Sequence, residues 1–140
     1  NNTIANSKYA GLYISGISEA VNITGNVIIN SNTSGIHIYK SIKPGKYKII
    51  NNKITGFCVN GNSYGSRCAG IEVSEGLESY YEIGQNTISN TGYLSKPTGI
   101  NFIPGFTNVN GVALNNNIDY GTTRGIANHM SPPGNLKLNP

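Results

Sequence analysis

Apolar and polar residues alternate along short stretches of this chain, and these stretches follow two repeating phrases. The first phrase is Asn-x-Ile, whose five regularly spaced copies have isoleucines 24, 26, 34 and 30 residues apart. The second phrase begins at a glycine and places two apolar residues around a third residue, as in Gly35-Ile36-His37-Ile38. A period of two residues is typical of strands, whereas a helix repeats every 3.6 residues. The first phrase begins at Asn2, Asn26, Asn52, Asn86 and Asn116, and the second at Gly11, Gly35, Gly70, Gly99 and Gly125.

Two interleaved phrases at this period predict a solenoid of stacked rungs, each made of three strands. The first strand precedes the asparagine, the second contains the isoleucine of Asn-x-Ile, and the third starts at the glycine. We expect a sharp bend at the asparagine itself, because asparagine tolerates the left-handed backbone conformation. Parallel stacking would align the isoleucines as interior columns. It would also align the asparagines as a buried ladder whose amides hydrogen-bond one another.

These motifs resemble those of the right-handed parallel β-helix of the pectate-lyase-like superfamily, which includes bacteriophage tailspikes and polysaccharide-degrading enzymes. The resemblance implies an all-β fold, a right-handed parallel β-helix of about five rungs covering residues 1–128. Residues 129–140 contain three prolines and no repeat, so we expect an irregular C-terminal arm there. A solenoid needs a cap over its end rung. Because residue 1 already lies within a repeat, we expect the chain to be a fragment of a longer protein.

Composition narrows the classes of partner. Charged residues make up only 11% of the chain, and the net charge of +4 reflects few acids. The one basic stretch, from Lys40 to Lys53, lacks the interleaved aromatic residues of a nucleic-acid site, so we expect no nucleic-acid partner. No run of 18 apolar residues occurs, so we expect no membrane insertion. No cofactor is expected either.

The two cysteines, Cys58 and Cys68, stand at the ends of a stretch rich in Gly, Asn and Ser. A disulfide and two free thiols both fit this spacing. A disulfide would favour an extracellular location. Because two thiols without a second pair of ligands do not form a metal site, we expect no metal.

The outward residues of the third strands form the first candidate site. In each strand the residue between the two inward side chains faces out, and like positions lie about 4.8 Å apart from rung to rung. His37 and Glu72 are candidate catalytic residues, and Tyr13, Asn101 and the nearby Tyr39 are candidate substrate-binding residues. The alternative is an ordinary solvent-facing polar stripe. The full column reads Tyr13, His37, Glu72, Asn101 and Ala127.

The second candidate site is an acidic segment. Four of the six carboxylates lie between Glu72 and Glu82, and a glycosidase needs two carboxylates about 5–9 Å apart. Glu72 and Glu75 are the candidate catalytic pair, and Tyr80 and Tyr81 are candidate rings for a sugar to stack on. The alternative is a segment that only adds solubility. A Ca²⁺-dependent lyase is disfavoured, because the resemblance implies a carboxylate cluster and a nearby arginine that the motif alignment does not provide.

The resemblance and the charge-poor, Asn- and Gly-rich composition favour a bacteriophage tailspike-like shaft that recognises a cell-surface polysaccharide. Such a protein would be extracellular or on the virion surface, and the resemblance implies a homotrimer. Whether it also cleaves the glycan stays open. One alternative is a part of a secreted polysaccharide lyase, hydrolase or epimerase. Another is a structural or adhesin β-helix that has no ligand.

Overall fold

The computed structural model describes residues 1–16, 19–40, 45–59, 68–74, 79–90, 97–103, 110–119, 123–128 and 135–138. Their regular secondary structure consists of strands, which form three sheets of five strands each. Sheet A contains β1 (Thr3–Ala5), β4 (Val27–Ser31), β7 (Lys53–Phe57), β10 (Thr87–Ser89) and β13 (Asn117–Ile118). Sheet B contains β2 (Leu12–Ser15), β5 (Ile36–Tyr39), β8 (Ala69–Ser74), β11 (Thr98–Phe102) and β14 (Ile126–Asn128). Sheet C contains β3 (Val21–Thr24), β6 (Lys46–Ile50), β9 (Tyr80–Gly84), β12 (Asn110–Leu114) and β15 (Asn135–Leu138).

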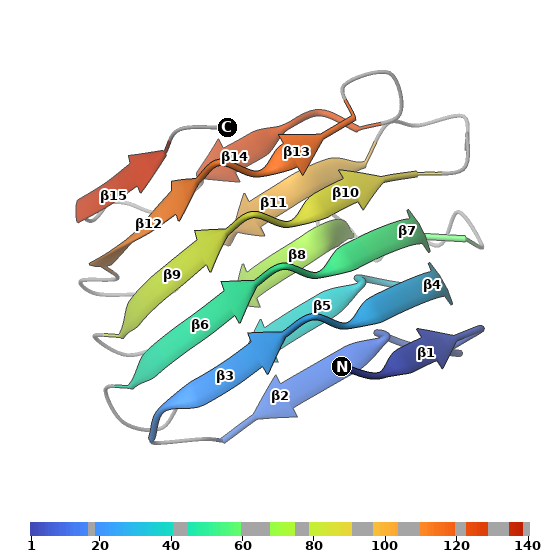
Figure 1. Ribbon diagram of the computed structural model, residues 1–140, viewed down its shortest axis with the longest axis horizontal. Coiled ribbons are helices and arrows are strands. Elements are labelled where there is room, and N and C mark those ends of the chain that lie inside the picture. Colours follow the sequence, from blue (N-terminus) through green and yellow to red (C-terminus); the bar gives the residue numbers. More distant parts are fainter. Residues whose placement is uncertain are drawn as a thin grey trace.

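The chain visits sheets A, B and C in turn, so that three consecutive strands complete one rung. Each strand pairs in parallel with the corresponding strand of the next rung, as β4 does with β7. Figure 1 shows the rungs stacked from the N-terminus to the C-terminus, with sheets C and A across the front and sheet B behind them. The prediction of an all-β parallel solenoid of about five rungs is therefore confirmed.

The interior consists of columns of aligned apolar side chains. The isoleucines of Asn-x-Ile align in sheet A, where Ile28, Ile54 and Ile88 are at most 1% exposed. Sheet C adds Tyr47 and Tyr81, whose rings stack with centroids 4.8 Å apart. Burying one isoleucine side chain stabilises a fold by about 1.5–3 kcal/mol, so the columns account for much of the driving force. The predicted sheet B column is also confirmed, as Leu12, Ile36, Ile71, Ile100 and Ile126.

Two residues join sheet C to sheet A at each of the four connections between them. The first of the two has a positive φ: 67° at Gly25, 57° at Asn51, 55° at Gln85 and 54° at Asn115. The ladder asparagine is the second. The expectation of a left-handed asparagine within the ladder is therefore wrong. The preceding residue turns the chain, which leaves the ladder residue to direct its N–H and its side chain along the solenoid axis.

The predicted asparagine ladder is confirmed, and the hydrogen bonds between its asparagines run in one direction. The backbone N–H and the side-chain Nδ2 of Asn52 both donate to Oδ1 of Asn86, at 2.9 and 3.0 Å. The same Nδ2 also donates to the carbonyl of Ile23 in the first rung, at 3.0 Å. Asn26 donates to Asn52 in the same way. Because these side chains are buried, the ladder satisfies polar groups that would otherwise destabilise the core.

The glycines of the second phrase are explained by close packing. A Cβ on Gly70 would lie 2.5 Å from Cγ2 of Ile88 and 2.7 Å from the carbonyl oxygen of Gly99. Gly35 has the same relation to Ile54 and to the carbonyl of Gly70. The glycine column therefore lets the sheet A isoleucine of the next rung approach the backbone.

Cys58 and Cys68 form a disulfide, with Cα atoms 5.9 Å apart. The bond spans the connection between β7 and β8, and both residues belong to the buried core. Of the two alternatives that the sequence left open, the structure has the disulfide.

The C-terminal segment contains one more strand than the sequence pattern suggested. Residues Asn135–Leu138, placed by the pattern in a non-repeating arm, form β15 and pair in parallel with β12. They therefore provide the sheet C strand of the fifth rung. The rest of residues 129–140 lies outside the described residues. Nowhere in the described part of the chain is there a helix long and apolar enough to cross a membrane.

Candidate functional site

The outer face of sheet B holds the column that the sequence pattern predicted. Tyr13 is in register with His37, His37 with Glu72, and Glu72 with Asn101. These residues come from strands β2, β5, β8 and β11, one in each of the first four rungs. The parallel stacking therefore brings together side chains that are far apart in the sequence.

Burial divides this column into an open part and a covered part. Tyr13 is 54% exposed, whereas Glu72 is 0% and Asn101 is 1% exposed. The His37 side chain lies between these extremes, at 17%. The candidate catalytic residue Glu72 is therefore in register with the outward residues of the neighbouring strands, but its side chain is not accessible to solvent.

Hydrogen-bonding groups surround the buried carboxylate. The hydroxyl of Ser34 donates to Oε2 of Glu72 at 2.5 Å, and Nε2 of His37 lies 3.4 Å from Oε1. The same Nε2 is 2.5 Å from the hydroxyl of Ser74. In a Ser-His-acid triad the acid and the hydroxyl contact opposite nitrogens of the imidazole. Here both contacts are at one nitrogen, so the residues described around His37 do not have the geometry of a triad.

Three rings cover the open part of the column. The ring centroids of Tyr13 and His37 are 5.2 Å apart and nearly perpendicular, and those of Tyr13 and Tyr39 are 6.1 Å apart. The centroids of His37 and Tyr39 are 5.7 Å apart. Edge and offset contacts at these distances stabilise aromatic clusters, so the rings hold one another in place on this face.

The second candidate site is only partly described. Glu75 lies outside the described residues, so its separation from Glu72 stays untested. Tyr80 and Tyr81 are neighbours on β9, and their side chains point to opposite faces of the sheet, as the pleat requires. Tyr81 is 1% exposed and lies in the core, while Tyr80 is 42% exposed on the outer face of sheet C. Tyr80 alone of the two is therefore placed to meet a ligand.

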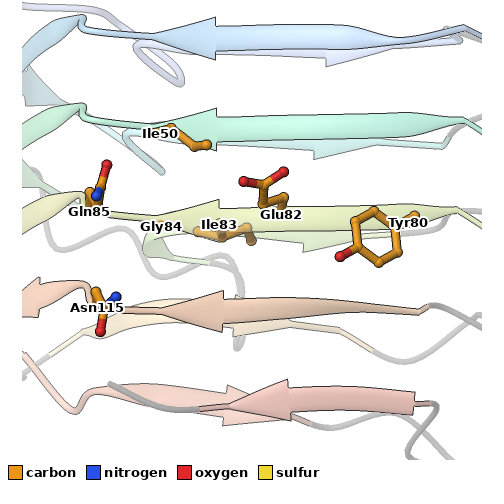
Figure 2. A pocket seen from close by; sticks show the side chains of 7 residues that line it. All are labelled: Ile50, Tyr80, Glu82, Ile83, Gly84, Gln85 and Asn115. Carbon is orange, nitrogen blue, oxygen red and sulfur yellow. The ribbon is translucent and has the colours of Figure 1, made fainter.

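A groove runs beside Tyr80 on the outer face of sheet C. It consists of two shallow hollows of about 440 and 370 Å³, and both are lined by Tyr80 and Glu82. Figure 2 shows Tyr80 and Glu82 on one strand, with Gln85 and Asn115 at the following turns. We call these two hollows the sheet C groove. Its other lining residues are Ala20, Asn22, Lys46, Tyr47, Lys48, Ile50, Ile83 and Gly84.

The sheet C groove crosses several rungs. Asn22 lines one hollow and Asn115 the other, and they lie three rungs and three residues apart in register. At about 4.8 Å per rung and 3.3 Å per residue this separation is roughly 17 Å, the length of a short oligosaccharide. Nζ of Lys48 lies 3.5 Å from Oε2 of Glu82 across the groove floor.

Sequence reasoning found Tyr80 but missed the rest of this groove. Asn22, Lys48 and Glu82 are the middle residues of strands that the pattern identified, but they differ in type from rung to rung, so no repeated phrase marked them as one surface.

A third hollow, of about 680 Å³, opens at the end of the first rung. Its lining includes Ile4, Leu12, Ile14 and Val21, which belong to the interior columns. It is thus the open end of the core, and we assign no ligand to it.

Among the residues that the structure describes, no group of three or more His, Cys, Asp or Glu side chains is arranged to hold a metal ion. The fold places the chain among parallel β-solenoids. In the comparisons with known proteins, no family model, no curated protein and no solved structure matches this chain.

Proposed function

We propose that this chain recognises a polysaccharide along the sheet C groove, as the shaft of a tailspike-like, right-handed β-helix protein. The observation that carries the proposal is the exposed ring of Tyr80 between two hollows. Amide and charged side chains line the same two hollows. Binding sites for small polar ligands combine apolar contact area with a few well-placed polar groups, and this groove has both.

The groove suits a sugar chain in particular. A pyranose ring presents an apolar face, which packs on an aromatic side chain, and a rim of hydroxyls, which exchange hydrogen bonds with amides and charged groups. Tyr80 provides the ring, and Asn22, Gln85 and Asn115 provide exposed amides on the first, third and fourth rungs. Tyrosine loses little conformational entropy when a ligand contacts it. Tyr80 and Asn22 lie on strands, which hold side chains more rigidly than loops do.

The proposed setting is extracellular or on a virion surface. The Cys58–Cys68 disulfide supports this, because disulfides persist mainly in oxidising compartments. A homotrimer is part of the same proposal and rests on the resemblance to tailspikes.

Replacing Tyr80 by alanine tests the proposal. We expect Tyr80→Ala to weaken binding to the recognised polysaccharide at least about fivefold, because truncating a central tyrosine of a binding site typically costs at least about 1 kcal/mol. Binding would be measured by isothermal titration calorimetry or surface plasmon resonance against a panel of neutral and acidic bacterial polysaccharides. Tyr9→Ala is the matched control, since Tyr9 is 78% exposed and does not line the groove.

The size of the polysaccharide is measured in the same incubation. Binding without shortening of the polysaccharide supports a receptor-binding shaft, whereas shortening would make the protein a polysaccharide-degrading enzyme. If no member of the panel binds, or if Tyr80→Ala and Tyr9→Ala behave alike, the proposal is wrong. The structural or adhesin alternative would then be favoured.

A further inference from the structure

One hollow of the sheet C groove places an ammonium group beside the exposed ring. Lys46 and Tyr80 are in register on adjacent strands β6 and β9, which puts their Cα atoms about 4.8 Å apart. Both side chains point outward, and both line the hollow of about 440 Å³. A sugar stacked on Tyr80 would therefore lie within reach of the Lys46 ammonium.

The charges of this hollow do not cancel. Its lining contains Lys46, Lys48 and Glu82. Glu82 forms an ion pair with Lys48, so these two charges largely offset each other. Lys46 forms no ion pair within the part of the chain that the structure describes. The hollow thus carries one positive charge that its own lining does not neutralise.

From this arrangement we infer that the groove selects an acidic sugar residue, one whose anionic substituent contacts Lys46 while its ring packs on Tyr80. The inference rests on the polysaccharide binding proposed above and names the class of polysaccharide. Lysine acts as a point charge without a fixed hydrogen-bonding geometry, so a carboxylate, a sulfate or a phosphate substituent would each satisfy it.

The contact gains strength from the neighbouring ring. A charge pair that is fully exposed to water contributes little. A sugar that covers Tyr80 excludes water from one side of the Lys46 ammonium, and the attraction between opposite charges increases as water is excluded. Lys46 and Tyr80 are therefore expected to act together, so that their effects on binding are not additive.

Pairs of polysaccharides that differ only in charge test this inference. Polygalacturonate would be compared with its carboxyl-reduced form, and dextran sulfate with dextran, at matched chain length. We expect the acidic member of at least one pair to bind about tenfold more tightly, the usual effect of a hydrogen bond to a charged group. Lys46→Gln should remove most of that difference and leave the binding of the neutral member unchanged. Lys46→Arg should retain it.

Lys53→Gln is the matched control, because Lys53 is exposed on sheet A and does not line the groove. It removes the same charge from the molecule, so an equal loss in Lys53→Gln and Lys46→Gln would indicate a net-charge effect and overturn the inference. Equal binding of acidic and neutral members would also overturn it, while a loss on Tyr80→Ala would still uphold polysaccharide binding. If neither member of any pair binds, both proposals fail.

Discussion

At the scale of single residues, the asparagine ladder concentrates several buried hydrogen bonds on one side chain. Oδ1 of Asn86 accepts two hydrogen bonds from Asn52, and its Nδ2 donates to Ile49 and to Asn116. We predict that Asn86→Ala lowers the free energy of unfolding by at least about 3 kcal/mol, since it leaves buried partners unsatisfied. Urea unfolding followed by circular dichroism would measure this.

Asn117→Ala is the control, because Asn117 is exposed on the outer face of β13. This variant should stay within about 0.5 kcal/mol of the parent, as surface substitutions usually do. A similar cost for both variants would contradict the account of the ladder.

The residue scale also shows where sequence reasoning ends. The ladder could be predicted because one residue type recurs at one position in every rung. The left-handed position before it could not, because Gly25, Asn51, Gln85 and Asn115 share no residue type, and glutamine is not a residue that favours positive φ. Glu72 illustrates a second limit. Alternation predicts which face a side chain points to, but it does not say whether other parts of the molecule cover that face.

At the scale of elements, the connections between strands differ more than the strands do. The connection from β7 to β8 is closed by the Cys58–Cys68 disulfide. We predict that the double variant Cys58→Ala/Cys68→Ala is about 2–3 kcal/mol less stable than the oxidised parent, because the cross-link limits the unfolded chain. Thermal unfolding with and without a reductant would test this. The reductant should destabilise the parent and leave the double variant unchanged; equal stability of the oxidised parent and the variant would contradict the prediction.

Most of the strands could be predicted from the sequence, and β15 is the exception. Asn135-Leu136-Lys137-Leu138 alternates in the same way as Tyr47-Lys48-Ile49, yet the neighbouring prolines suggested an arm. Proline restricts its own position and the residue before it. It does not prevent a strand two residues later, and β15 begins at Asn135.

At the scale of the whole molecule, stability should vary along the solenoid axis. Each rung contacts only its neighbours, so the end rungs can open while the middle stays folded. We predict that backbone amides of β7, which pairs with β4 and β10, exchange with solvent at least about tenfold more slowly than those of β1, whose one partner among the described strands is β4. Hydrogen exchange followed by mass spectrometry or NMR would measure this. Uniform exchange across sheet A would instead indicate that all rungs open together.

The candidate binding surface is formed by residues from several rungs. Lys46, Tyr80 and Asn115 belong to three different rungs and share one face of the molecule because the rungs stack in register. No local motif joins them, so the sequence could not present them as one site. The columns on sheet B could be predicted because a repeated phrase marks their register, but the sheet C groove depends on side chains that differ in every rung.

The two-residue turn between sheets C and A has a consequence for how such a chain can change over time. An insertion there would move the next asparagine out of line with its neighbours, whereas the connections after sheets A and B already vary in length. Selection can therefore lengthen, shorten or replace those two connections in each rung independently. The solenoid is thus a framework in which new surface features arise without rebuilding the core.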